Sequence, residues 1–166
     1  MRILTSTVAA ALLALAAFAP ASAANRGPTI VDIAVSVNAS SGEFDHLIAA
    51  ADRAGLVATL DGNRQFTVFA PTDAAFEDLF DALGVASVND IPLETLRAVL
   101  LYHVAPGERF AADVLSANRI RTLQRGFIAP SVVGTTAYVN GAEILAADID
   151  ASNGVIHVID AVLLPS

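Results

Sequence analysis

The sequence predicts an α+β fold, with helices in the first half of the chain and short strands in the second. Apolar residues recur at helical spacing up to about residue 104, and after this point short apolar runs alternate with turn residues. The 166 residues contain no internal repeat and no low-complexity linker. We therefore expect one domain in which helices and strands are segregated rather than regularly alternating.

The N-terminal segment matches a secretory signal peptide. Arg2 supplies a positive charge, an apolar run follows, and residues 21–23 have the small-x-small pattern of a signal peptidase site. We expect residues 1–23 to be the cleaved signal peptide, residues 24–27 a short leader and residues 28–166 the domain. Since no second long apolar run follows, the mature chain is predicted to be secreted or periplasmic, without membrane insertion. The alternative is an uncleaved anchor.

Two helices and a strand are predicted in the first part of the domain. Thr29 and Asp32 fit a helix start, in which a Thr side chain and an acidic residue three positions later cap the backbone. Residues 43–54 carry apolar side chains at helical spacing, and Gly55 ends this helix. Residues 66–69 are aromatic and β-branched, which predicts a strand.

Two further helices follow this strand. Pro71 ends the strand, and Thr72 or Asp73 is expected to cap the next helix. Pro92 fits the first turn of the second helix, because the N–H groups of a first turn have no partner within the helix. Residues at helical spacing are expected to face the core, namely Phe76, Leu79, Phe80 and Leu83 on the first helix and Leu93, Leu96, Val99 and Leu100 on the second.

The rest of the chain is predicted to form mainly strands. Residues 135–139 and 142–147 flank Asn140-Gly141, which is the strongest short hairpin signal that a sequence offers. A turn at residues 152–154 leads into a nearly continuous apolar strand over residues 155–164.

Charge and cysteine content exclude several kinds of site. Removing Arg2 with the signal peptide leaves 8 Arg against 17 acidic residues and changes the net charge from −8 to −9. Such a chain repels nucleic acid, which binds proteins through basic surfaces. The absence of Cys excludes disulfides, thiolate metal sites and a cysteine nucleophile.

Catalytic and metal sites are not indicated. His46, His103 and His157 lie far apart in the sequence and lack the spacing of a helical metal-binding pair. Asp148 and Asp150 are spaced like the first ligands of a calcium loop, but the closing glutamate of such a loop is missing. No nucleophile elbow, phosphate-binding loop or dinucleotide motif is present. We expect a non-catalytic protein without a metal or cofactor.

Three motifs occur in a defined order along the chain. They are residues 66–76 (FTVFAPTDAAF), residues 102–104 (YHV), and residues 152–160 (SNGVIHVID) followed by Leu164-Pro165. In this order, behind a signal peptide, they resemble the fasciclin domain family of secreted and cell-surface adhesion modules. Residues 66–76 are similar to the first signature box of this family, and residues 152–160 with Leu164-Pro165 are similar to its second signature box. The resemblance covers about residues 28–165. It implies a wedge-shaped β-sandwich of short strands with several α-helices packed on it.

The resemblance also implies roles for individual residues. In animal matrix members, integrin binding has been assigned to a Tyr-His element and to an Asp-Ile pair, and Tyr102-His103 and Asp148-Ile149 occupy these places. Residues 146–147 are Ala-Ala where those members have Glu-Pro, which argues against integrin itself as the partner. The alternatives are a solvated turn carboxylate for Asp148 and a core histidine for His103. Other signature residues are expected to be structural, namely Thr72, Asp73, Asn153, Gly154 and His157.

We therefore predict a secreted, non-catalytic module for cell adhesion or for extracellular protein and matrix interaction. Its expected partner is a cell-surface or matrix protein or glycan. The alternative is an exported carrier of an apolar ligand such as a carotenoid or lipid, because some exported fasciclin-domain proteins of photosynthetic organisms bind carotenoids. The apolar composition, with eight Phe and two Tyr, is compatible with this alternative.

Overall fold

The computed structural model describes residues 27–165. The predicted signal peptide, most of the predicted leader and Ser166 lie outside the described residues. In chain order the elements are α3 (Ile30–Ser41), α4 (Asp45–Ala54), α5 (Val57–Leu60), β1 (Phe66–Pro71), α6 (Asp73–Leu83), the 3-10 helix η1 (Val88–Asp90), α7 (Leu93–Tyr102), β2 (Val104–Pro106), α8 (Ala111–Ser116), β3 (Ile120–Arg121), β4 (Phe127–Ile128), β5 (Pro130–Val133), β6 (Thr136–Val139), β7 (Ala142–Ala151) and β8 (Gly154–Ile159).

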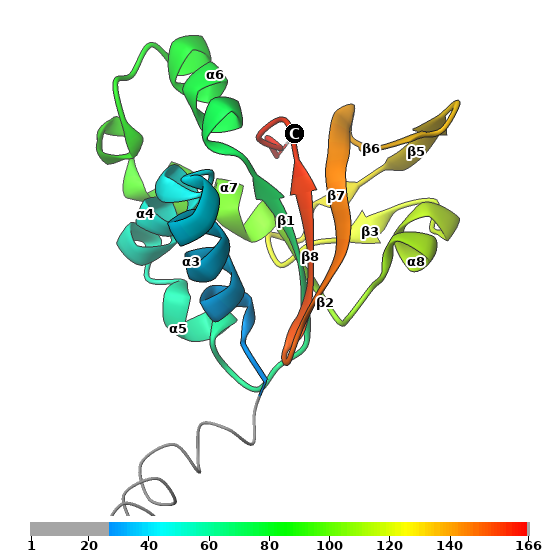
Figure 1. Ribbon diagram of the computed structural model, residues 1–166. Coiled ribbons are helices and arrows are strands. Elements are labelled where there is room, and N and C mark those ends of the chain that lie inside the picture. Colours follow the sequence, from blue (N-terminus) through cyan, green and yellow to red (C-terminus); the bar gives the residue numbers. More distant parts are fainter. Residues whose placement is uncertain (1–26, 166) are drawn as a thin grey trace, which may run out of the picture.

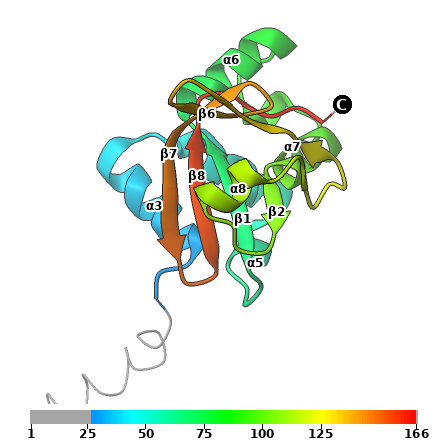
Figure 2. The ribbon, with the colours of Figure 1, turned by 90° about the vertical axis from the view of Figure 1, so that its right-hand side faces the viewer.

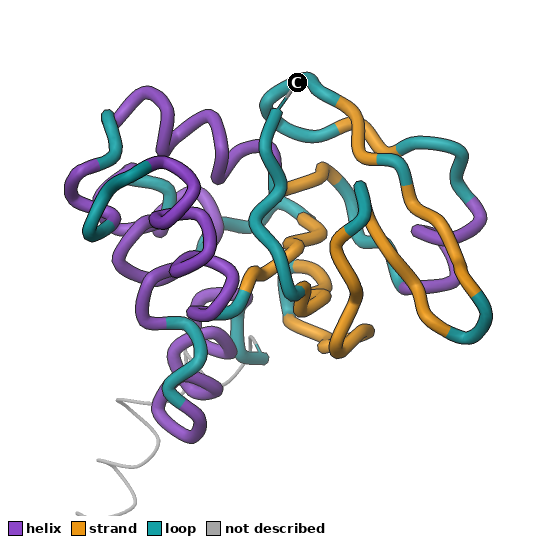
Figure 3. Tube along the Cα trace, turned by 90° about the horizontal axis from the view of Figure 1, so that it is seen from above, coloured by secondary structure: helices purple, strands orange, loops and turns teal. Residues whose placement is uncertain are grey.

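The strands form a six-stranded mixed sheet and a separate two-stranded pair. The sheet has the order β2-β1-β8-β7-β6-β5, and β3 pairs with β4. Neighbouring strands are antiparallel, except that β1 and β8 run parallel at the centre of the sheet. Helices α3 to α7 gather on one side of the central strands, with β3, β5, β6 and α8 on the other (Figures 1 and 3). The predicted fold, an α+β wedge of short strands in a β-sandwich with several α-helices packed on it, is confirmed as helices packed on a curled mixed sheet (Figure 1).

The central strands β1 and β8 are covered on both faces. Successive side chains of a strand point to opposite faces. Val68 and Ile156 therefore pack with residues of α3 and α4, whereas Phe69 and Ile159 pack with residues of β3, β4 and α8. Figure 2 shows α8 in front of these strands. Burial of both faces explains why β1 and β8 are largely apolar, with Thr67 and His157 as buried exceptions.

A third cluster of apolar side chains holds the helices to one another. Phe76, Leu79 and Leu96 are among its buried members and come from the predicted inner faces of α6 and α7. Two positions of the predicted faces are wrong, since Leu83 is 48% exposed and Leu93 is 43% exposed. Leu83 is the last residue of α6 and Leu93 the first of α7, so both lie beyond the packed part of their helix.

Several predicted boundaries are also wrong. β7 runs to Ala151 instead of ending at residue 147, because two register shifts keep it paired with β8 past the polar residues that suggested a turn. β8 ends at Ile159 instead of residue 164, and the chain then leaves the sheet. Pro92 precedes α7 as its N-cap instead of lying in its first turn. Helix α8 and strand β5 had no predicted counterpart.

Candidate functional site

Tyr102 is the last residue of α7, and its side chain connects this helix to strand β4 and to the turn between β6 and β7. Its side chain is 2% exposed. The hydroxyl donates to the carbonyl oxygen of Phe127 in β4 at 2.5 Å and accepts from Nδ2 of Asn140 at 2.8 Å. Asn140 is the first turn residue of the predicted hairpin and has a φ of +49°. Tyr102 therefore links three segments that lie far apart in the sequence.

His103 follows Tyr102 and is held as a neutral ring. Its Nε2 accepts from the N–H group of Leu163 at 2.8 Å, so its protonated Nδ1 donates to the carbonyl oxygen of Val99 at 2.7 Å. Burial lowers the pKa of His103 to about 4, and the hydrogen bond to Val99 opposes this shift only in part. The side chain is 2% exposed and both ring nitrogens are used, so the ring acts as a core histidine.

His157 lies in strand β8 and is also held as a buried ring. Its Nδ1 accepts from the backbone N–H of Asp148 at 3.3 Å, so Nε2 donates to the carbonyl oxygen of Arg109 at 2.9 Å. Burial lowers the pKa of His157, while the hydrogen bond to Arg109 and the charge of Asp148 oppose the shift. The ring also stacks on Phe69, with the centroids 5.6 Å apart.

Asp148 and Ile149 are consecutive residues of β7, but the side chain of Asp148 is exposed to solvent and that of Ile149 contacts the core. Asp148 has a φ of +59° at the register shift of β7, is exposed, and accepts from the N–H of Ala111 at 2.6 Å. Its carboxylate thus binds the start of α8 and is more than a solvated turn residue. Ile149 is half-buried and packs with the helix-side core.

Two residues of the first signature box cap two different helices. Thr72 is the N-cap of α6 and accepts from the N–H of Ala75 at 3.4 Å. The carboxylate of Asp73 instead accepts from the N–H groups of Asp45 and His46, at 3.3 Å and 2.9 Å, at the start of α4. Phe44, the N-cap of α4, has no side-chain cap of its own, so Asp73 supplies it from a distant part of the chain.

The second signature box joins the two ends of the domain. Asn153 accepts from the N–H of Ile30 at 2.9 Å and donates to the carbonyl oxygens of Leu60 and Gly62, at 2.5 Å and 3.0 Å. Gly154 has a φ of +151°, and a Cβ at this position would lie 1.8 Å from the carbonyl oxygen of Phe66. Only glycine fits there, because the backbones of β1 and β8 are in contact.

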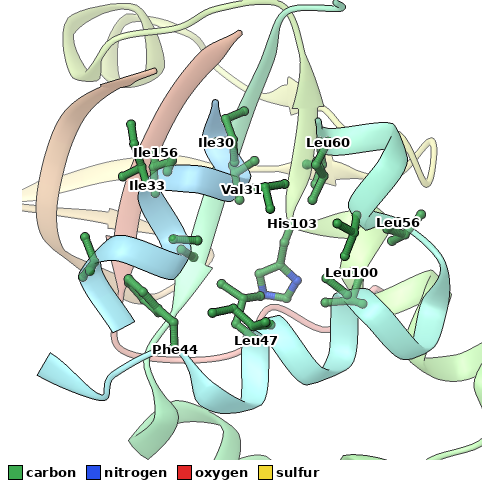
Figure 4. Close-up of a pocket in the computed structure, with 18 of the residues that line it drawn as sticks. Ile30, Val31, Ile33, Phe44, Leu47, Leu56, Leu60, Leu100, His103 and Ile156 are labelled. Atoms are coloured by element: carbon green, nitrogen blue, oxygen red, sulfur yellow. The ribbon is translucent and has the colours of Figure 1, made fainter. Parts of the chain in front are cut away.

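An apolar cavity that the sequence did not reveal lies between α3, α4, α5 and the sheet (Figure 4). Its volume is about 70 Å³, and among its lining residues His103 has the only polar side chain. Ile149 lines the same cavity, so the structure brings these two predicted site residues together there. The sequence offered no signal for this cavity, because apolar residues at helical spacing in α3, such as Ile30, Ile33 and Val37, predict a buried face and not a gap beneath it.

Comparison with models of known protein families gives a match over most of the chain. The fasciclin domain model matches residues 42–165, which include both signature boxes. The chain belongs to the fasciclin domain family. Our fasciclin domain is 41% identical to protein sll1483 of Synechocystis sp. over 141 residues, which cover 82% of this chain and 73% of that protein.

A second sequence and a solved structure are also similar to the chain. The transforming growth factor-beta-induced protein ig-h3 of Sus scrofa is 33% identical over 82% of our chain, which spans 19% of that protein. Among solved structures, the FAS1 domain pair of the insect cell adhesion molecule fasciclin I superposes with a TM-score of 0.68 at 17% identity, covering 82% of our chain and 51% of that chain. The latter likeness shows the fold of the fasciclin domain.

The structure distributes the predicted binding residues of the fasciclin domain over two faces of the sheet. Asp148 lies beside His157 on the α8 side, whereas His103 and Ile149 face the cavity on the helix side. Within residues 27–165 no group of three or more His, Cys, Asp or Glu side chains is placed to bind a metal ion. In the same part of the chain, no helix has the length and apolar character needed to cross a membrane.

Proposed function

We propose that this fasciclin domain is a secreted or periplasmic, non-catalytic module that mediates contact between a cell surface and an extracellular protein, matrix component or glycan. One observation carries the proposal: among the described residues, no buried side-chain nitrogen or oxygen lacks a hydrogen-bond partner. The polar groups of the signature boxes are thus used inside the fold, which leaves the surface for function. The matched solved structure comes from a cell adhesion molecule, which makes adhesion the interaction to test first.

The surface that includes Asp148 is our candidate contact site. Asp148 is exposed, and its carboxylate is oriented by the hydrogen bond to Ala111. Ile149 supports this segment from the core. Tyr102 and His103 are buried, so we assign them a positioning role, in which they hold the hairpins and the C-terminal segment in place.

Attachment of cells to surfaces coated with the purified domain tests this proposal. Asp148→Asn removes the charge but keeps an oxygen acceptor for Ala111, and Asn tolerates a positive φ. Asp150→Asn is the matched control, since Asp150 is exposed in the same strand and loses the same charge. We expect Asp148→Asn to reduce attachment and Asp150→Asn to leave it unchanged. Equal attachment by all three proteins would exclude Asp148 from the contact surface.

A second candidate function, carriage of an apolar ligand, is favoured by the cavity beneath α3. Its volume of about 70 Å³ is too small for a carotenoid, since an engineered cavity of about 150 Å³ holds only benzene. Carriage would therefore require α3 to move away from the sheet. Native mass spectrometry and an absorption spectrum of the exported protein test this candidate through a bound mass of a few hundred daltons or a visible chromophore.

A pair of variants on α3 separates this candidate from adhesion. Ala34 lines the cavity, whereas Val35 is 49% exposed on the same helix. If the cavity holds the ligand, Ala34→Phe lowers the bound fraction and Val35→Phe does not. A protein that is colourless and free of ligand when isolated from its exported fraction would eliminate the carrier function.

A further inference from the structure

The charges of this chain are separated into two regions. Residues 114–142 contain three Arg and no Asp or Glu, whereas the remaining residues carry all 17 acidic side chains against six Arg. This acid-free segment comprises the end of α8 and strands β3 to β6. In Figure 1, β3, β5 and β6 lie on the side of the sheet away from α3, α4 and α6. A chain that is acidic as a whole therefore has one segment in which all charged side chains are cations.

The three Arg of the acid-free segment lie on the β3–β4 hairpin. Ile120 and Ile128 are 1% and 0% exposed and pair with each other, so they form the inner face of this hairpin. Strand alternation then places Arg121 and its cross-strand neighbour Phe127 on the outer face. Arg119 comes just before β3, and its guanidinium carbon lies 4.3 Å above the centre of the Phe127 ring. The outer face thus combines an aromatic ring with cations.

These groups are available to a ligand. Arg119, Arg121 and Arg125 are exposed, and Phe127 is 45% exposed. Arg125 lies in the tight turn that joins the two strands, with a φ of +77°. Among the described residues, no carboxylate hydrogen-bonds to these three guanidinium groups, so their charges face solvent. Stacking on Phe127 also orients the guanidinium of Arg119 before any ligand binds.

We propose that the β3–β4 hairpin binds an anionic polysaccharide, a proposal that rests on the extracellular interaction role given above. Guanidinium groups bind anionic groups such as carboxylates through paired hydrogen bonds, and the stacking of Arg119 on Phe127 holds one of these guanidinium groups in place. A linear chain can follow the hairpin and avoid the acidic remainder of the protein.

Binding to immobilised dextran sulfate, alginate and neutral dextran tests the proposal. We expect binding to the two anionic polymers and none to neutral dextran. Three cationic contacts predict that raising the salt concentration fourfold weakens binding by about 20- to 40-fold, by analogy with other linear polyanions. Addition of a chelator should leave binding unchanged, since the contact needs no bridging cation.

Single-charge variants identify the binding face. Arg121→Ala is expected to lower the slope of log affinity against log salt by about one, because one contact is lost. Arg64→Ala is the matched control, since Arg64 is exposed outside the acid-free segment. Because both side chains are exposed, folding should be retained, and circular dichroism checks this. The triple variant of Arg119, Arg121 and Arg125 to Ala should lose binding to both anionic polymers.

Several results would overturn the proposal. These are equal effects of Arg121→Ala and Arg64→Ala, binding that a chelator abolishes, and binding to anionic vesicles or single-stranded DNA without binding to the polysaccharides. If cells attach to the wild-type domain but no anionic polymer binds, this inference fails while the proposed function stands. If wild-type protein binds the polymers but supports no cell attachment, the adhesion role fails and the hairpin site stands.

Discussion

Replacement of the buried His103 by Gln is the most direct test of how the core of this fasciclin domain responds to acid. His103 uses both ring nitrogens in hydrogen bonds within the core, and it is neutral there. Gln has no ring to protonate, and its amide is able to replace part of the hydrogen bonding. We expect His103→Gln to be less stable than the wild type at pH 7 by about 1–3 kcal/mol, because one buried polar partner loses its hydrogen bond.

The pH dependence follows from the pKa of His103 in the two states. Burial lowers this pKa to about 4 in the folded protein, whereas the unfolded chain has the ordinary value of 6.5. Between these values the unfolded state binds one proton that the folded state does not. The free energy of unfolding therefore falls as the pH falls from about 6.5 to about 4. At about 1.4 kcal/mol per pH unit, the loss due to His103 is about 3 kcal/mol.

Urea unfolding followed by circular dichroism at a series of pH values measures this difference. His157 also has a lowered pKa from burial, but it is present in both proteins, as are the carboxylates. Between pH 6.5 and pH 4, the free energy of unfolding of the wild type should fall by about 3 kcal/mol more than that of His103→Gln. The difference between the two proteins, plotted against pH, should have the slope that corresponds to one proton. Parallel curves for the two proteins would show that His103 binds a proton equally in the folded and unfolded states, and this would refute a ring that stays neutral in the core down to about pH 4.

Two further substitutions test individual contacts of the fold. Gly154→Ala should lower the free energy of unfolding by more than about 4 kcal/mol, because the new Cβ would lie 1.8 Å from the carbonyl oxygen of Phe66. The control is Gly134→Ala, where φ is +65° but no atom lies near the new Cβ, and thermal unfolding should show a loss of about 1–2 kcal/mol. Similar losses at both glycines would contradict the close approach of β1 and β8. Tyr102→Phe should lower the free energy of unfolding by about 1–3 kcal/mol, because the carbonyl oxygen of Phe127 and the side-chain amide of Asn140 lose their hydrogen bonds to the hydroxyl. A loss no greater than that of the control Tyr138→Phe would contradict the linking role of Tyr102.

The candidate site was predictable from the sequence only in part. Thr72 caps the helix that follows it, as expected, because an N-cap and its helix are neighbours in the sequence. Asp73 caps α4 instead, at a separation of 27 residues from His46, and no local pattern encodes such a contact. The proposed polysaccharide site was also hidden, since the sequence shows the acid-free segment but only the pairing of β3 with β4 places Arg121 and Phe127 on one face of a hairpin.

The sequence by itself determined the α+β class, the inner faces of the main helices, the family and the positions of the signature boxes. These features depend on periodicity and on turn residues, which act over a few neighbouring positions. Only the tertiary structure decided that Tyr102 and His103 are buried, that Asp148 holds α8, and that a cavity lies beneath α3. The physical reason is that burial and hydrogen bonding depend on segments up to 123 residues apart, such as Ile30 and Asn153, whose contact leaves no local signal.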